Sequence, residues 1–146
     1  MKKTAAFIIL VLVAIQFIPL ERTNPKENPK LALHTDKKVM KILQKSCYDC
    51  HSNNTRWSKY AYIAPLSFGV VSHVKDGREA LNFSNYKNIP KDIKLARLKR
   101  AIHMIRLGTM PLGSYTLFHH DAKLSSNEKK IVIKWLHQEI DKLEKE

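Results

Sequence analysis

Residues 46–53 read Ser46-Cys47-Tyr48-Asp49-Cys50-His51-Ser52-Asn53, and this stretch decides how the rest of the chain must fold. Cys47 and Cys50 are the only two cysteines among 146 residues, and His51 follows the second one directly. Side chains three residues apart face the same side of a helical turn, so the two thiols can reach one common group. The histidine is then held beside that group.

The spacing Cys-x-x-Cys-His is the attachment signature of c-type haem. Each thiol can add across one vinyl group of the same porphyrin, and the following histidine lies beneath the iron as its proximal ligand. The sequence therefore predicts one covalently bound haem c, with thioethers at Cys47 and Cys50 and an iron ligand at His51.

Two other sites could use the same cysteines. A closed structural zinc site needs four ligands, and without a second cysteine pair His73, His103 or His119 would have to complete it. A thioredoxin-like dithiol accompanies a βαβ pattern, which this sequence lacks. Zinc, a dithiol and a simple disulfide are the alternatives to haem at this position.

Met110 is the best candidate for the iron ligand on the opposite haem face. It lies in Gly108-Thr109-Met110-Pro111, where the glycine can end a helix and the proline stiffens the loop. Paired methionine and histidine ligands are a common way to raise the reduction potential of cytochromes c, although most methionines simply fill gaps in a core. The rival ligands are His73, His103, Met104, His119 and His120.

Polar side chains that follow the motif could bind the haem carboxylates. Arg56 matches a carboxylate best, and Trp57 and Tyr60 can each donate one hydrogen bond. Ordinary packing at the edge of a loop is the equally good alternative for all three.

Four segments after residue 33 show the apolar spacing of amphipathic helices, at about residues 36–47, 65–79, 90–107 and 125–143. Thr35 or Asp36 can cap the first helix, Pro65 suits the first turn of the second, and Ser125 with Glu128 forms a possible capping box for the last. Arg100 and most other charges of the third helix are expected to be solvated. The inner faces comprise Val39, Ile42, Leu43, Phe68, Val70, Val71, Val74, Leu95, Leu98, Ile102, Ile105, Val132, Trp135, Leu136, Ile140 and Leu143.

No segment alternates apolar and polar residues with the period of a strand, so the predicted fold is all-α. It is a small, cytochrome c-like helical domain wrapped around one haem. Residues 48–64 and 108–124 are expected to be long connecting loops, which are uncommon in a compact domain unless they pack on something. A large flat cofactor between the two loops would supply the missing core.

The N-terminus has the features of an export signal. Lys2 and Lys3 precede an apolar run over residues 5–20 in which Gln16 is the only strongly polar residue. No convincing cleavage site follows, which favours an uncleaved anchor, although the run is slightly shorter than the roughly 20 residues that span a bilayer. We therefore expect a signal peptide or signal anchor at 1–20, a polar tether at 21–33 and the haem c domain at 34–146, on the periplasmic side of a bacterial cytoplasmic membrane.

The net charge of +13 gives the chain a surface that attracts anionic partners. Charge alone does not distinguish nucleic acid, anionic lipid and acidic proteins, but the export signal argues against nucleic acid. The expected partners are redox proteins with acidic contact patches, together with the membrane through the N-terminal helix. No small-molecule substrate is indicated.

Further motifs extend the pattern over nearly the whole chain. They are residues 47–53, Trp57 with 60–65, Gly77-Arg78-Glu79, Asn82-Phe83-Ser84, 108–111, Leu124-Ser125 leading to Glu128 and Trp135, and, near the N-terminus, 16–18 and Asn24-Pro25. In these motifs the chain resembles a family of bacterial haem-binding domains, which are short exported c-type proteins. The resemblance implies a haem c domain with His51 as proximal and Met110 as distal ligand. Ser58 departs from the pattern, which has proline after the tryptophan, but it touches no iron ligand.

One-electron transfer is the function that these expectations favour, with no substrate chemistry at the iron. The alternative is a haem-based enzyme or sensor whose distal site opens to peroxide or a gas. A non-haem thiol-disulfide protein is the second alternative. Because no separate set of catalytic residues is apparent, an electron carrier or haem-binding module is favoured over an enzyme.

Overall fold

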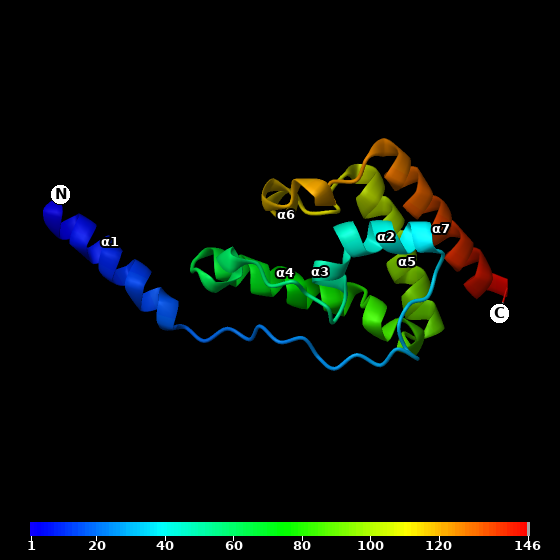
Figure 1. The fold of residues 1–146 in the computed structure, drawn as a ribbon, viewed down its shortest axis with the longest axis horizontal. Helices are drawn as coiled ribbons and strands as arrows, with labels where there is room; N and C mark the ends of the chain where they lie inside the picture. The colour runs from blue at the N-terminus through cyan, green and yellow to red at the C-terminus, as the bar shows by residue number, and fades with distance from the viewer. Residues whose placement is uncertain (146) are drawn as a thin grey trace.

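The computed structural model describes residues 1–145, and over that range the chain is helical with no β-strand (Figure 1). The prediction of an all-α fold is therefore confirmed. The elements are α1 (Lys2–Ala14), η1 (Ile15–Phe17), α2 (Lys37–Ser46), α3 (Tyr48–His51), η2 (Lys59–Tyr62), α4 (Leu66–Ala80), η3 (Phe83–Asn88), α5 (Lys91–Leu107), α6 (Gly113–Phe118), η4 (His120–Ala122) and α7 (Ser126–Lys145).

The helix boundaries follow the capping residues that the sequence supplies. Asp36 Oδ1 accepts hydrogen bonds from the backbone N–H groups of Lys38 and Val39, both at 3.0 Å, and so starts α2. Gly108 has a φ of 72°, a left-handed conformation that glycine adopts without strain, and it ends α5. These two predicted boundaries are confirmed.

The predicted capping box also forms at the start of α7. The Ser125 N–H donates to Glu128 Oε2 at 2.9 Å, and the Glu128 N–H donates to Ser125 Oγ at 3.2 Å. The Lys45 ammonium of α2 lies 2.6 Å from Glu128 Oε1. The start of α7 is thereby fixed to the end of α2, just before the first cysteine.

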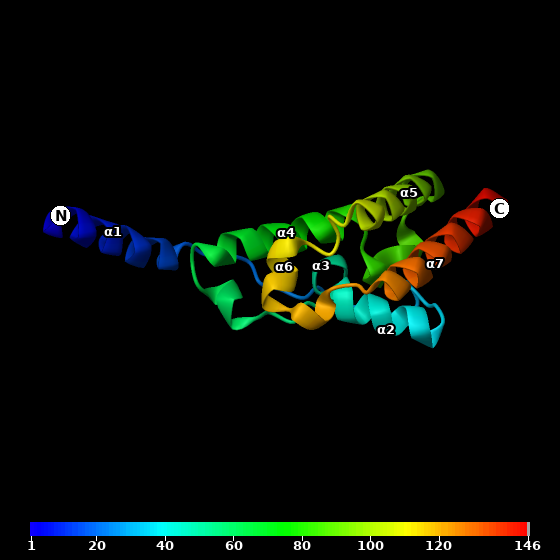
Figure 2. The same ribbon diagram turned by 90° about the horizontal axis from the view of Figure 1, so that it is seen from above.

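The main core lies where α2, α5 and α7 pack together (Figures 1 and 2). Most residues that the sequence places on the inner faces of these helices are buried there. Leu43, Leu98, Leu136 and Val132 are the largest apolar side chains of the core that are fully buried. Phe83 and Tyr86 of η3 complete the core.

α4 lies apart from this core and packs on α3. Its buried residues are Ser67, Val74 and Gly77, a narrower and smaller set than the valine and phenylalanine stripe expected from the sequence. A Cβ atom on Gly77 would lie 2.5 Å from the backbone oxygen of Cys50, so only glycine allows α4 to approach the Cys-x-x-Cys-His turn this closely. Phe68, Val70 and Val71 are instead only partly buried.

The two segments expected to be long loops contain short helices instead. Residues 48–64 include α3 and η2, and residues 108–124 include α6 and η4. Each helix has only three to six residues, too few for an apolar period to be visible in the sequence. The expectation of structureless connections was therefore wrong.

The segment after α1 is extended and is held along the domain. Arg22 Nε donates to Ala61 O at 2.6 Å, Asn24 Nδ2 donates to Thr55 O at 3.0 Å, and Leu33 N donates to Phe83 O at 2.8 Å. Residues 21–33 thus have no helix or strand, as expected of a tether, but they do not stand free of the domain. In the described chain, none of the helices combines the length and the apolar character needed to cross a membrane.

Candidate functional site

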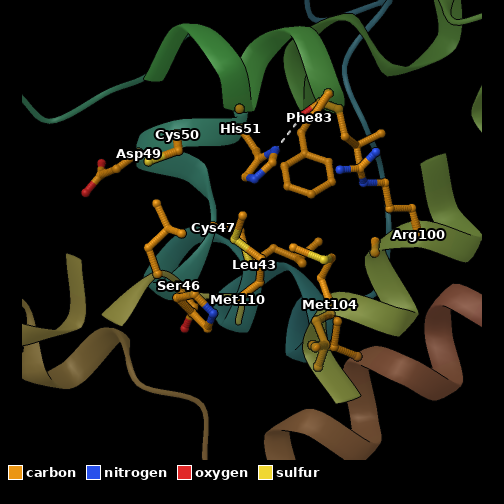
Figure 3. Close-up of a pocket in the computed structure, with 18 of the residues that line it drawn as sticks. Leu43, Ser46, Cys47, Asp49, Cys50, His51, Phe83, Arg100, Met104 and Met110 are labelled. Carbon is orange, nitrogen blue, oxygen red and sulfur yellow. Dashed lines mark hydrogen bonds between the residues drawn. The ribbon is translucent and has the colours of Figure 1, made fainter. Parts of the chain in front are cut away.

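A cavity of about 680 Å³ opens between the core and α4, and both cysteines line it. Its other lining residues come from helices α2 to α7, from η3 and from the segment after α5. They include His51, Phe83, Arg100, Met104 and Met110, and Figure 3 shows these side chains around the cavity. Residues far apart in the sequence therefore meet around the Cys-x-x-Cys-His turn.

The two thiols are free, and both cysteines are partly buried at this cavity. Burial is the main reason why the pKa of Cys47 is raised to about 12 and that of Cys50 to about 11. Both side chains are consequently neutral thiols at pH 7. Reactive dithiols instead need a lowered pKa, because the thiolate is the nucleophile.

The ring of His51 has one nitrogen satisfied and the other available. His51 Nδ1 lies 3.0 Å from the carbonyl oxygen of Leu81, the hydrogen bond drawn as a dashed line in Figure 3. A carbonyl only accepts, so Nδ1 carries the proton and Nε2 keeps a free lone pair. Burial lowers the pKa of His51, which keeps the ring neutral as a metal ligand must be.

Two methionines lie across the cavity from His51 and Phe83 (Figure 3). Met110, the distal ligand predicted from the sequence, is partly buried against the core. Met104 lines the same cavity from α5, and its sulfur lies 3.5 Å from the Thr109 hydroxyl. The N–H groups of Thr109 and Met110 both donate to the Met104 carbonyl, so the backbone at Met110 is held directly to the backbone at Met104.

Asp49, between the two cysteines, fixes the outer side of the turn. Its carboxylate accepts two hydrogen bonds from the Arg56 guanidinium, both at 3.1 Å, and one from the Tyr115 hydroxyl at 2.7 Å. Burial by itself would raise the pKa of Asp49, but these bonds outweigh burial and hold it below its ordinary value. Arg56 is thus already paired with a carboxylate of the protein.

The three residues expected at the haem carboxylates line a second cavity of about 280 Å³ instead of the first. Arg56, Trp57 and Tyr60 lie there, and the Tyr60 hydroxyl is 2.8 Å from His119 Nε2. The second cavity shares Asp49, Cys50, His73, Leu112 and Tyr115 with the first, so the two are neighbours.

Arg97 and Arg100 are the cationic residues at the main cavity that sequence reasoning missed. Both line it from α5, and neither makes a hydrogen bond or ion pair with another described residue. In Figure 3, Arg100 lies on the side of the cavity away from Cys50 and Asp49. The spacing of Arg97, Arg100 and Met104 places them on one face of α5, and that spacing was the available signal.

The cavity has the features of a site that needs an occupant. Ser46 Oγ and Trp135 Nε1 are buried beside it and have no hydrogen-bond partner within residues 1–145. Leu43, Phe83 and Leu136 belong to the core cluster and line the cavity as well, so the core forms one wall of the cavity. Native cores have few voids larger than a water molecule, and a large, mostly apolar group would fill this one.

The alternative ligands expected from the sequence are distributed unevenly. His73 lines both cavities, whereas His103 and His120 are exposed and His119 is bonded to Tyr60. Among residues 1–145, no three histidine, cysteine or acidic side chains are grouped closely enough to bind a metal ion by themselves. This geometry does not favour a closed zinc site.

Comparison with known proteins gives one match. A family model described as a haem-binding domain matches residues 10–138, which is most of the chain. No curated protein and no solved structure is significantly similar to it.

Proposed function

The chain belongs to the haem-binding domain family, and from that membership we propose that it carries one covalently attached haem c and passes single electrons between partner proteins. The observation that carries the proposal is the shared cavity of Cys47, Cys50, His51 and Met110. Bound haem supplies an iron that accepts and releases one electron at a time. The protein's part is to bind the group, orient it and exclude water.

Covalent attachment fits two neutral thiols that face a cavity of this size. Each thiol would add its sulfur and its hydrogen across one vinyl double bond, so that no atom is lost and no oxidant is needed. Because the pair Cys47 and Cys50 lies on one turn at the cavity wall, both sulfurs can reach neighbouring vinyl groups. The close approach at Gly77 holds that turn in place.

His51 Nε2 and a methionine sulfur would bind the iron. The Leu81 carbonyl orients the imidazole and raises its basicity, as hydrogen bonds to metal-bound histidines generally do. We assign the second ligand to Met110, because the Met104 sulfur already lies near the Thr109 hydroxyl.

Arg97 and Arg100 would bind the haem carboxylates. In a porphyrin attached through its vinyl groups, the propionates lie at the opposite edge of the ring. Arg100 lies on the side of the cavity opposite Cys50, and Arg97 is one turn earlier on the same helix (Figure 3). Unpaired guanidinium groups match carboxylates well. This proposal replaces Arg56, whose guanidinium already binds Asp49.

Electron transfer at the outer face of the cytoplasmic membrane suits the remaining features of the chain. An iron with six ligands has no open position for a substrate. The net charge of +13 would favour brief contacts with acidic redox partners. The charged start and apolar α1 are consistent with export and with retention at the membrane, since the family match begins inside α1.

Mass spectrometry of the full chain from a host that matures cytochromes c tests the proposal. We expect the mass to rise by one intact haem, and the purified protein to show a Soret band. In the variant C47S/C50S we expect no covalent haem, whereas S126A, at an exposed serine of α7 that does not line the cavity, keeps it.

Two results would overturn the proposal. A wild-type chain whose two sulfurs return free or joined to each other, with no Soret band, would exclude haem c. A reduced protein that binds carbon monoxide immediately would exclude the closed electron carrier and favour an enzyme or sensor.

A further inference from the structure

The end of the domain nearest α1 carries an exposed apolar surface. Tyr62, Ile63 and Leu66 are 50–58% exposed at the junction of η2 and α4, and Leu117 and Phe118 of α6 are 64% and 53% exposed. The Tyr60 and Phe118 rings lie 4.7 Å apart, and Leu66 and Phe118 line the same cavity, so the two groups are adjacent. We call residues 62, 63, 66, 117 and 118 the apolar end.

Gln16 joins this end directly to the N-terminal helix. Its Nε2 donates to the carbonyl of Ala64 at 3.1 Å, and its Oε1 accepts from the Ala64 N–H at 2.9 Å. The same Nε2 also lies 2.8 Å from Leu12 O in the last turn of α1. The one strongly polar side chain of the apolar run therefore links α1 to the domain.

Arg22 extends the connection. Besides its bond to the Ala61 carbonyl, its guanidinium lies over the Tyr62 ring, 4.9 Å from the centroid. Gln16, Arg22 and residues 61–64 thus form one hydrogen-bonded joint between α1 and the domain. Figures 1 and 2 show α4 and α6 reaching toward α1 at this end, with the C-terminus far away.

α1 itself has no partner within the described chain. Phe7, Ile8 and Leu10 are 53–65% exposed, none of its residues is buried, and no acidic residue occurs in it. An apolar helix of this length fits the lipid of a membrane interface better than water, and it is too short to cross the bilayer. The joint then places the apolar end beside the lipid that surrounds α1.

The length of α1 strengthens this placement. Thirteen helical residues measure roughly 20 Å, against a hydrocarbon thickness of about 30 Å. A short apolar helix draws its flanking residues into the membrane interface. Tyr62 and Phe118 have the aromatic character typical of that interface, and Arg22 and Lys59 supply cations for headgroups.

We propose that the apolar end rests in the interface of the lipid bilayer that holds α1, so that the domain has a fixed orientation on the membrane. This inference depends on the proposed membrane attachment, but not on the haem. The occupant is lipid because the joint of Gln16 and Arg22 with residues 61–64 holds the apolar end next to α1, an apolar helix none of whose residues is buried.

Photocrosslinking of the full chain in phospholipid vesicles tests the inference. Phe118→p-benzoylphenylalanine is the test variant, Leu10→p-benzoylphenylalanine reports on α1, and Ile93→p-benzoylphenylalanine is the matched control, an exposed apolar site at the start of α5. We expect roughly tenfold more lipid adduct at position 118 than at position 93, because only the former lies at the interface. Haem content is measured for each variant as a check on folding.

Each outcome has a distinct meaning. Lipid adducts at position 10 but not at 118 would overturn this inference alone, and no lipid adduct at position 10 would overturn the membrane attachment with it. Crosslinks from position 118 to protein would show a partner or a second copy as the occupant. Q16A, which breaks the joint, should lower the amount of lipid adduct at position 118. Q138A, at an exposed position of α7, should leave it unchanged.

Discussion

His51 is oriented by a single backbone atom. The Leu81 carbonyl accepts a hydrogen bond from the Nδ1–H group, and the opposite nitrogen is left facing the cavity. Leu81 directly follows α4, so the helix that packs on the Cys-x-x-Cys-His turn also fixes its imidazole. On the far side of the cavity, the choice between two sulfurs depends on equally local contacts.

Replacing Met110 with leucine tests the choice of ligand. M110L keeps the volume and removes the sulfur, so we expect the reduced protein to bind carbon monoxide and its reduction potential to fall. The weak long-wavelength absorbance of the oxidised protein that accompanies methionine ligation should disappear. M104L is the matched control and should keep all three properties; the reverse pattern would assign the ligand to Met104.

Replacing the two cavity arginines tests the carboxylate site. In R97Q/R100Q two positive charges near the iron are lost, which favours the oxidised form, so we expect the reduction potential to fall by roughly tens of millivolts. Spectroelectrochemistry measures the shift. R106Q is the control, because Arg106 on the same helix is exposed and does not line the cavity.

An unchanged potential in R97Q/R100Q would contradict this assignment. His73, Asp76 and Glu79 also line the cavity from α4, so the potentials of R97Q/R100Q and wild type are compared at one pH.

At the level of elements, two contacts hold the Cys-x-x-Cys-His turn between its neighbours. Gly77 lets α4 lie against Cys50, and the ion pair of Lys45 with Glu128 joins α2 to α7. The first contact is steric and the second is electrostatic. The contact at Gly77 should therefore respond to a larger side chain, and the ion pair of Lys45 with Glu128 to a change of pH.

Adding one methyl group to α4 should separate it from α3. G77A forces a Cβ against the Cys50 carbonyl, and we expect a loss of about 1–3 kcal/mol in unfolding free energy and less covalent haem. G69A is a control on the same helix, where a Cβ meets nothing within 4 Å, and should be neutral or slightly stabilising. Urea unfolding measures both variants; equal stabilities would refute the close contact.

The start of α7 should be sensitive to acid. Hydrogen bonds from Lys45, and then from Ser125, lower the pKa of Glu128 from 4.5 to about 2. A lowered pKa means that the stabilisation is present above pH 4.5 and is lost as the pH falls toward 2. We expect E128Q to cost about 1 kcal/mol at pH 7 and much less near pH 2.

Unfolding of E128Q and wild type across this pH range checks the prediction. E144Q is the control. Glu144 lies on the same helix as Glu128, but it forms an exposed ion pair with Lys99 of α5, so its replacement should change the stability little at any pH. A constant difference between E128Q and wild type at all pH values would show that the carboxylate charge is not involved.

For the whole molecule, the helices form a shell: the core and α4 line a large cavity that lies between them. The helices bury enough apolar surface to define their arrangement, yet about 680 Å³ remains among them. A void of this size forfeits many van der Waals contacts, so the fold and its occupant depend on each other.

The chain without haem should be loosened. When wild type is made in a host that cannot attach haem, we expect a loss on the order of several kcal/mol in unfolding free energy and stronger binding of an apolar dye. Calorimetry and dye fluorescence on both forms measure this. Identical unfolding profiles would mean that the cavity collapses at no cost, and the shell description would fail.

The sequence alone predicted the longer helices, and it supplied the motif on which the proposed attachment of haem rests. Amphipathic spacing and caps at Asp36, Gly108 and Ser125 are local signals, and they predicted α2, α5 and α7 nearly to the residue. The motif at residues 47–51 is equally local. The short helices α3 and α6 escaped prediction because one turn shows no period.

Only the tertiary structure decided which side chains share the cavity. Arg56 follows the motif in sequence but turns outward to Asp49, whereas Arg100, fifty residues beyond Cys50, faces the same hollow as the cysteines. Proximity along the chain says little about proximity across packed helices, because helix packing depends on the shapes of many residues at once. The same reason explains why a glutamine in the apolar run joins the N-terminal helix to Ala64.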